Sequence, residues 1–275
     1  MKNTKQITKA MELVAASKMR RAQEYAVHGR VYREAAYSLL TRLSLITEVA
    51  DHPLFVQRDV KTRLYVAITS NRGLAGAYNS NIIRLLAKSF VADKAEGVKS
   101  QVIAIGKQAA QFARRVEGVE LIAAYESFGD RPTANDVRPL LNTVAEMYQE
   151  KTVDDVQLVY TDFRTNILQV ATKLPLLPAR FEATEGVESL ANVTFEPSIE
   201  AVLDNVTTRL LEVQLWQALL ESIASEHSMR MMAMKSATDN ASDLIADLTL
   251  SFNTARQAAI TQELAEITGG AEAMK

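Results

Sequence analysis

Residues 203–259 decide the fold, and they read LDNVTTRLLEVQLWQALLESIASEHSMRMMAMKSATDNASDLIADLTLSFNTARQAA. Alternate steps of three and four residues from Leu203 give 17 positions, of which 14 are apolar; the exceptions are Gln217, His227 and Thr238. This spacing predicts a left-handed coiled coil, because the apolar stripe of a straight helix would drift out of phase with it. No Gly or Pro occurs between Ser198 and Thr268. We therefore predict one helix far longer than the roughly 11–12 residues of an ordinary globular helix.

Residues 1–55 carry a second helical stripe with the same period. Its positions run from Met11 to Ala50, and Lys18 and Gly29 interrupt it. Residues 1–33 have eight basic and two acidic side chains (net +6), whereas residues 198–275 have five basic and eleven acidic ones (net −6). Opposite charges on two helices that each need an apolar partner favour an antiparallel pair within one chain. Pairing of each helix with a second copy of the chain is the alternative.

Residues 56–197 alternate apolar strands with amphipathic helices. Strands are expected at 63–69, 101–106, 155–162 and 167–174, and helices at 79–91, 107–116 and 133–149. Thr133 and Asn135 are candidate caps of the last helix. A short turn between the last two strands predicts an antiparallel edge on an otherwise parallel, Rossmann-like sheet. The predicted class is α/β: a long antiparallel coiled coil of N- and C-terminal helices (1–55 and 198–275) plus a small Rossmann-like α/β domain (56–197).

Composition excludes several kinds of site. The chain has no Cys, which excludes disulfides, thiolate nucleophiles and Cys-ligated metals. His28, His52 and His227 show no metal-binding spacing. The net charge of −2 argues against nucleic acid as a partner. No apolar run approaches the ~20 residues of a membrane span. We therefore predict a soluble chain with no catalytic residue, metal or cofactor of its own.

The loop from Ser70 to Tyr78 is a candidate phosphate site, since it lies between a predicted strand and a predicted helix N-terminus. It lacks the Lys-Ser/Thr ending of a Walker loop, and the spacing of Gly73 and Gly76 does not fit the dinucleotide fingerprint. A tight structural turn is favoured, and phosphate binding is the alternative.

Blocks from both ends and the middle of the chain resemble one protein family. Residues 2–23, KNTKQITKAMELVAASKMRRAQ, resemble the start of the gamma subunit of F-type ATP synthases. Residues 260–273, ITQELAEITGGAEA, are similar to that family's signature Ile-Thr-x-Glu-x-x-Asp/Glu-x-x-x-Gly-Ala. Residues 70–76, SNRGLAG, resemble its Ser-Asp-Arg-Gly-Leu-Cys-Gly loop, and residues 230–240 and 253–259 resemble its C-terminal helix. The blocks occur in the family's order.

This resemblance implies a rotor shaft. The coiled coil would lie inside a hexamer of alternating alpha and beta subunits, with the epsilon subunit and the membrane ring of c subunits at its foot. The chain would couple proton or other ion flow to ATP synthesis or hydrolysis without an active site of its own. It would lie on the cytoplasmic face of a bacterial cell membrane, in preference to the mitochondrial matrix face.

The resemblance also implies partner-contact residues. Arg256 and Gln257 would meet loops of the beta subunit, with Thr261 and Glu263 close by. A second set would face an acidic lever segment of the beta subunit: Lys18, Met19, Arg20 and Arg230. The alternative for each is a solvated flank of the coiled coil.

The sequence departs from the family pattern in three respects. Family members usually begin about a dozen residues earlier, so Met1 is expected to enter mid-helix. Asn71 replaces the usual Asp and Ala75 the usual Cys, and the cysteine-bearing regulatory insert of chloroplast members has no counterpart. Two other functions stay open: a coiled-coil scaffold without a rotary role, and a small nucleotide- or phosphate-binding enzyme with helical oligomerisation arms.

Overall fold

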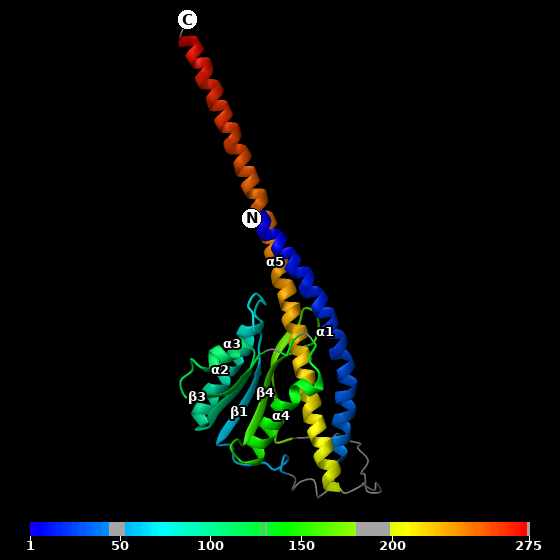
Figure 1. Ribbon diagram of the computed structural model, residues 1–275. Coiled ribbons are helices and arrows are strands. Elements are labelled where there is room, and N and C mark those ends of the chain that lie inside the picture. The colour runs from blue at the N-terminus through cyan, green and yellow to red at the C-terminus, as the bar shows by residue number, and fades with distance from the viewer. Residues whose placement is uncertain (44–52, 127, 130, 180–198, 274–275) are drawn as a thin grey trace. The chain divides into compact units, whose positions relative to one another are not determined.

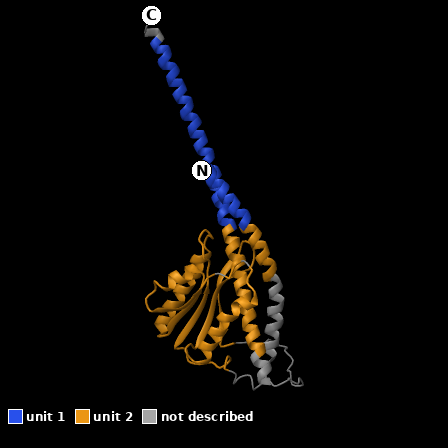
Figure 2. Ribbon diagram, in the orientation of Figure 1, with its two compact units in different colours: residues 1–14, 231–275 blue, residues 15–230 orange. Residues whose placement is uncertain are grey.

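The structure is a computed structural model that describes the chain except for residues 44–52, 127, 130, 180–198 and 274–275. In residues 27–43, 199–204 and 271–273 it describes the helical backbone alone. The chain divides into two compact units, residues 1–14 with 231–275 and residues 15–230 (Figure 2). Helices α1 (Lys2–Leu43) and α5 (Ile199–Ala273) each run through both units.

The larger unit contains a five-stranded sheet in the order β3-β2-β1-β4-β5 (Figure 1). Its strands are β1 (Thr62–Ile68), β2 (Lys99–Ile105), β3 (Val119–Tyr125), β4 (Asp155–Phe163) and β5 (Gln169–Leu177). The first four are parallel, and β5 is antiparallel to β4. The predicted Rossmann-like sheet with an antiparallel edge is therefore confirmed.

Two of the strand predictions need correction. Strand β3 was not predicted at all, because this edge strand is only half-buried and its apolar pattern is weak. The strand expected at 167–174 begins later, at Gln169, since Ile167 and Leu168 belong to the β4–β5 turn and are exposed.

Alternate residues of each central strand pack against helices on opposite faces of the sheet. On one face, Tyr65 and Ala67 of β1 pack with helices α2 (Tyr78–Glu96) and α3 (Lys107–Ala113). On the other face, Leu64, Val66 and Ile68 join a core with helix α4 (Ala134–Gln149) and with residues of α5. The α5 residues in that core include Leu211, Leu215, Leu219 and Ile223. This stretch of α5 is thus a layer of the α/β unit, with three layers in all.

Local sequence explains how two of these helices begin. Thr133 caps α4 in a capping box, in which the Asp136 carboxylate accepts the Thr133 backbone N–H at 2.7 Å. The prediction of Thr133 as a cap is confirmed. Before α3, Gly106 has φ +92°, and an added Cβ would lie 2.2 Å from the Thr69 carbonyl oxygen. Only glycine fits this close approach between the ends of β1 and β2.

Helices α1 and α5 pair antiparallel within the chain, as the charge pattern predicted. In the smaller unit, the hydroxyl oxygens of Thr8 and Thr238 lie 2.8 Å apart. In the larger unit, Gln217 Nε2 donates to the carbonyl oxygen of Ala26 at 2.9 Å. Gln217 and Thr238 are two of the three polar exceptions in the heptad series. Each therefore makes a side-chain hydrogen bond across the helix pair, which offsets part of the cost of burying a polar group.

The heptad series overestimates the length of α5 that packs against α1. With Thr8 opposite Thr238, Lys2 at the start of α1 is opposite Leu244 in an antiparallel pair. Leu248 and Phe252, both predicted as core, are 53% and 65% exposed. The apolar period of α5 thus continues into a segment where the described part of this chain does not bury it.

Candidate functional site

The predicted partner-contact residues at the C-terminal end of α5 lie on an open helical surface in the smaller unit. Arg256, Gln257, Thr261 and Glu263 are all exposed. The Thr261 hydroxyl donates to the backbone carbonyl of Gln257 at 2.9 Å, which satisfies it within the helix. Among the described residues, no hydrogen bond or ion pair engages the side chains of Arg256, Gln257 or Glu263. Their polar groups are available to another molecule.

Apolar side chains alternate with these polar groups along the same segment. Seven large hydrophobic residues between 244 and 267 are at least 41% exposed: Leu244, Leu248, Leu250, Phe252, Ile260, Leu264 and Ile267. Isolated exposed hydrophobic residues are ordinary, but a helix that exposes apolar residues over several successive turns is typical of an interaction surface. We call residues 244–267 the apolar-polar segment.

The second predicted set lies in the larger unit, and its members differ in exposure. Met19 is only 5% exposed, so in this chain its side chain belongs to the packed interior. Arg20 is exposed, and Lys18 is half-buried. These three residues occupy consecutive positions of α1, which point in different directions around the helix. The structure therefore places Arg20, and not Met19, where an acidic partner could reach it.

Arg230 is engaged by its own chain. Its side chain is 12% exposed, and Nη1 lies 2.7 Å from Glu226 Oε1, one helical turn earlier on α5. Nη2 donates to the carbonyl oxygen of Gly73 at 3.4 Å, and Nη1 lies 3.3 Å from His227 Nδ1. Arg230 thus attaches the loop that follows β1 to α5.

The loop from Ser70 to Tyr78 has the hydrogen bonds of a structural turn. The Ser70 backbone N–H donates to Asn79 Oδ1 at 3.0 Å, and the Ser70 hydroxyl donates to the Arg72 carbonyl at 2.6 Å. Leu74 has φ +63°, a left-handed conformation that is unusual for a residue with a Cβ. The polar groups at the start of the loop are thus bonded inside the chain, which supports the structural turn over a phosphate site.

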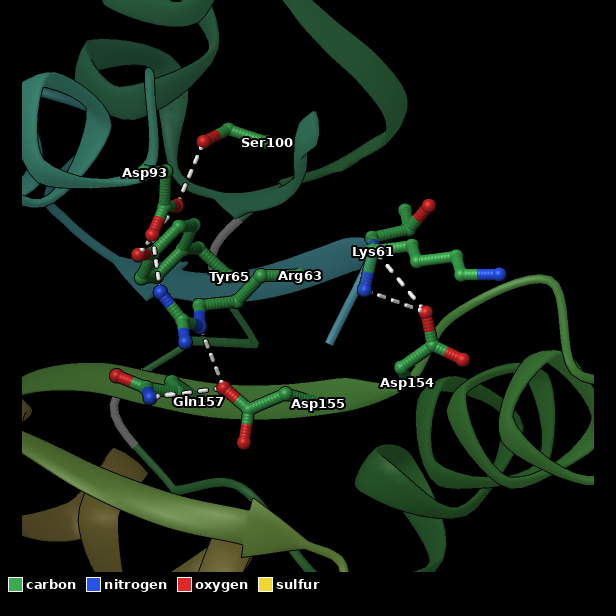
Figure 3. Close-up of polar contacts among 9 residues, drawn as sticks. Lys61, Arg63, Tyr65, Asp93, Ser100, Asp154, Asp155 and Gln157 are labelled. Carbon is green, nitrogen blue, oxygen red and sulfur yellow. Dashed lines mark hydrogen bonds and ion pairs between the residues drawn. The ribbon is translucent and has the colours of Figure 1, made fainter. Parts of the chain in front are cut away.

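A buried ionic cluster at the opposite end of the sheet was missed by sequence reasoning (Figure 3). Arg63 Nε donates to Asp155 Oδ2 at 2.6 Å, and Arg63 Nη1 donates to Asp93 Oδ1. The second Asp93 oxygen accepts the hydroxyls of Tyr65 and Ser100, both at 2.7 Å. The cluster ties α2 to β1, β2 and β4. The sequence signal that could have revealed this cluster is a charged residue at the first position of each of two predicted apolar strands, Arg63 and Asp155.

The cluster shifts the pKa values of Arg63 and Tyr65. Burial opposes the charged form of Arg63, but its hydrogen bond to Asp155 and the charge of Asp93 raise its pKa above the ordinary value. Burial, with the nearby Asp93 carboxylate, also raises the pKa of the Tyr65 phenol. Arg63 is thus charged and Tyr65 neutral, as their hydrogen bonds require. The cluster holds charges and protons in fixed places, which is the property of a structural element.

Two other kinds of site are absent from the described residues. No group of three or more His, Asp or Glu side chains there could hold a metal ion. Within the same residues, no helix has the length and apolar character needed to cross a membrane.

Comparisons with known proteins agree on one family. A family model described as ATP synthase matches residues 1–274. The ATP synthase gamma chain of Heliobacterium modesticaldum is 42% identical over 281 aligned positions, which cover 99% of this chain and 95% of the relative. The ATP synthase gamma chain of Herpetosiphon aurantiacus is 43% identical, with the same coverage.

Solved structures with a similar fold come from the same kind of assembly. A central stalk and c-ring structure of the Tetrahymena thermophila mitochondrial ATP synthase contains a chain that matches with a TM-score of 0.67. The match has 24% identity and covers 84% of this chain and 99% of that one. A chain in the Euglena gracilis mitochondrial ATP synthase matches with a TM-score of 0.60 and 19% identity, over 97% of this chain and 95% of that one. At these identities the matches show the shared fold.

Proposed function

Because this chain belongs to the family of ATP synthase gamma chains, we propose that it is the central-stalk subunit of an F-type ATP synthase. In this role it rotates inside the hexamer of alpha and beta subunits and couples ion flow through the membrane sector to ATP synthesis or hydrolysis. The observation that carries the proposal is identity above 40% over almost the whole length of relatives that bear this name.

The apolar-polar segment supports this function physically. A single long helix that is asymmetric in its side chains, placed in a ring with near-threefold symmetry, contacts each catalytic subunit differently. If those contacts depend on the angle of the shaft, then the shaft angle and the nucleotide affinity of each catalytic site share free energy. Arg256 and Gln257 would supply the polar part of these contacts, with Thr261 and Glu263 beside them.

Further contacts of the complex are assigned by the same reasoning. Arg20, with Lys18 and Arg230, would face an acidic segment of the beta subunit, since opposite charges guide such encounters. Met19 would support this surface from the interior. The epsilon subunit and the ring of c subunits would bind the foot of the shaft. The chain would reach the membrane only through this complex, on the cytoplasmic face of a bacterial cell membrane.

Reconstitution tests the proposed function directly. The chain is combined with alpha and beta subunits of a bacterial relative, and the complex is purified through a tag on the beta subunit. We expect this chain to copurify and ATP hydrolysis to rotate it in a single-molecule assay. A hexamer that binds no copy of the chain, or that hydrolyses ATP while a bound chain stays still, would contradict the proposal. A static scaffold predicts the second result.

A further inference from the structure

Three buried serines of α5 lie at the C-terminal end of the sheet, all within the larger unit. Ser222, Ser225 and Ser228 are spaced by three residues, so they lie along one side of the helix. Each is 0% exposed. In a buried helix, hydroxyl side chains need partners, and their partners here belong to the sheet rather than to α5 itself. We call these three residues the serine row.

Two members of the serine row bind the same residue of β4. The Thr161 backbone N–H donates to Ser222 Oγ at 3.1 Å, and the Ser225 hydroxyl donates to the Thr161 carbonyl at 3.3 Å. Pairing of β4 with β1 ends at Val159. Beyond that residue, the edge of β4 on the β1 side has no neighbouring strand in the described sheet. The serine row therefore supplies the donor and acceptor that an adjacent strand would otherwise provide.

The third serine binds the turn that joins β4 to β5. The Ser228 hydroxyl donates to the Asn166 carbonyl at 2.8 Å, and Gln169 Nε2 donates to Ser228 Oγ at 3.2 Å. The Ser222 side chain also lies next to the buried phenol of Tyr78 on α2. The row thus contacts a strand, a turn and a helix of the α/β unit over two turns of α5.

The serine row lies at the place in the fold where open α/β sheets usually bind ligands. In an open α/β sheet, ligands bind at the carboxyl ends of the strands, where the chain reverses the direction in which strands are added. In the order β3-β2-β1-β4-β5, this reversal lies between β1 and β4. The serine row binds β4 at that end of the sheet, and Arg230 binds the loop that follows β1. A helix of the same chain therefore occupies the usual ligand position.

We propose that Ser222, Ser225 and Ser228 are positioning residues that fix the angle of the sheet about α5, so that torque on the α/β unit passes into the shaft helix. This proposal rests on the proposed rotor function. Apolar packing between α5 and the sheet is strong but not directional, and it resists separation more than rotation. Hydrogen bonds lose strength when their angles change, so a row of them along the helix resists turning of the helix against the sheet.

A single-molecule measurement on the assembled ATP synthase tests the proposal. Because the chain has no Cys, a Lys88→Cys substitution on the exposed surface of α2 gives one attachment point for a bead on the α/β unit. The hexamer is fixed to a surface and stalled without ATP, so that the angular spread of the bead reports how firmly the sheet is held by the shaft. ATP-driven rotation and proton pumping are measured in the same preparations.

The test variant is Ser222→Ala with Ser225→Ala and Ser228→Ala. The matched control is Ser89→Ala with Thr143→Ala, which removes two hydroxyls that bond only to carbonyls of their own helices. We expect the angular variance of the test variant to rise about twofold above the control, because at least three directional bonds to the sheet are lost. Proton pumping per ATP hydrolysed should fall, while hydrolysis continues.

The outcomes separate the two proposals. If the parent complex rotates but the test variant has the angular variance and pumping ratio of the control, the serine row does not position the sheet. If the parent bead does not rotate under ATP at all, the proposed rotor function fails instead. If the triple variant does not assemble, Ser228→Ala alone is measured. That variant leaves both Thr161 bonds in place, and an angular variance equal to the control would overturn the inference.

Discussion

Thr8 and Thr238, which are 230 residues apart in the sequence, share a hydrogen bond between hydroxyls 2.8 Å apart. Both residues are buried, and the Thr8 hydroxyl also donates to the Lys5 carbonyl oxygen at 3.1 Å. The Thr238 hydroxyl likewise lies 2.8 Å from the Met234 carbonyl oxygen, so each hydroxyl has a partner in its own helix as well as the one across the pair. A slip of the register would lose the bond between the helices and would place each hydroxyl against apolar side chains, so this polar pair favours one register of the coiled coil.

This contact predicts a crosslink within one chain. In the Thr8→Cys/Thr238→Cys variant, which has no other cysteine, oxidation should join the two helices and leave the molecule monomeric. Non-reducing electrophoresis and the mass of the oxidised protein give the measurement. The matched control is Thr8→Cys with Thr249→Cys, whose second residue lies beyond the start of α1 and should not react. Crosslinks found only between two copies would mean that the helices pair between chains.

A second prediction concerns the buried ionic cluster of Figure 3. Asp93→Ala leaves Arg63 with one carboxylate and removes the acceptor of the Tyr65 and Ser100 hydroxyls. Removal of one partner from a buried ion pair costs about 3–5 kcal/mol, because the remaining charge and donors stay buried. We expect the free energy of unfolding in urea to fall by about that amount.

The control for this variant lies on the same helix. Glu96→Ala removes an exposed carboxylate from the end of α2, and it should change the free energy of unfolding by no more than about 0.5 kcal/mol. Equal effects of Asp93→Ala and Glu96→Ala would show that the cluster contributes little to stability.

Some parts of the fold follow from sequence patterns alone. The heptad series of α5 predicts a coiled coil because each apolar step reports one helical face, and the opposite net charges of the two arms predict the antiparallel pair. Alternating strands and helices likewise predict the parallel sheet. In each case the signal is local periodicity or composition, which a single chain displays without knowledge of its neighbours.

Other parts of the fold depend on which elements pack against each other, and the periodicity of the sequence does not show this. Leu211, Leu215 and Leu219 of α5 pack into the core of the sheet, so this stretch is buried on more than the coiled-coil side. By contrast, Leu248 continues the heptad series but is 53% exposed. The role of the serine row could not be predicted from the sequence either, because its partners include backbone groups of Thr161 and Asn166, which every residue type carries.

A third prediction concerns stability at high pH. Burial raises the pKa of Tyr65, Tyr78 and Tyr148 above the ordinary value of about 10. The native state therefore keeps protons that the unfolded chain releases. The stability linked to these three phenols is fully present below about pH 10 and is lost as the pH rises toward their native pKa values.

Tyrosinate absorbance checks this expectation. Of the eight tyrosines, about three fewer should ionise in the native protein than in denaturant at about pH 11, where an ordinary phenol is about 90% ionised. Tyr78→Phe should reduce that difference by one, whereas replacement of the exposed Tyr25 with Phe should leave it unchanged. Identical titration curves for native and denatured protein would contradict the assignment of buried neutral phenols.

The last prediction separates partner contacts from stability of the helix. Arg256 and Gln257 are exposed and have no side-chain partner in the described part of the chain, so replacement of both with Ala should change the free energy of unfolding by no more than about 0.5 kcal/mol. If they bind loops of the beta subunit, the complex should lose hydrogen bonds worth about 1–3 kcal/mol each, and coupled turnover should fall accordingly.

The matched control is Arg84→Ala with Gln111→Ala, two exposed residues on α2 and α3. Thermal unfolding of the free chain and ATP-driven proton pumping of the assembled complex are measured for both pairs. Pumping at the parent rate in the Arg256/Gln257 variant would show that these side chains are only solvated surface.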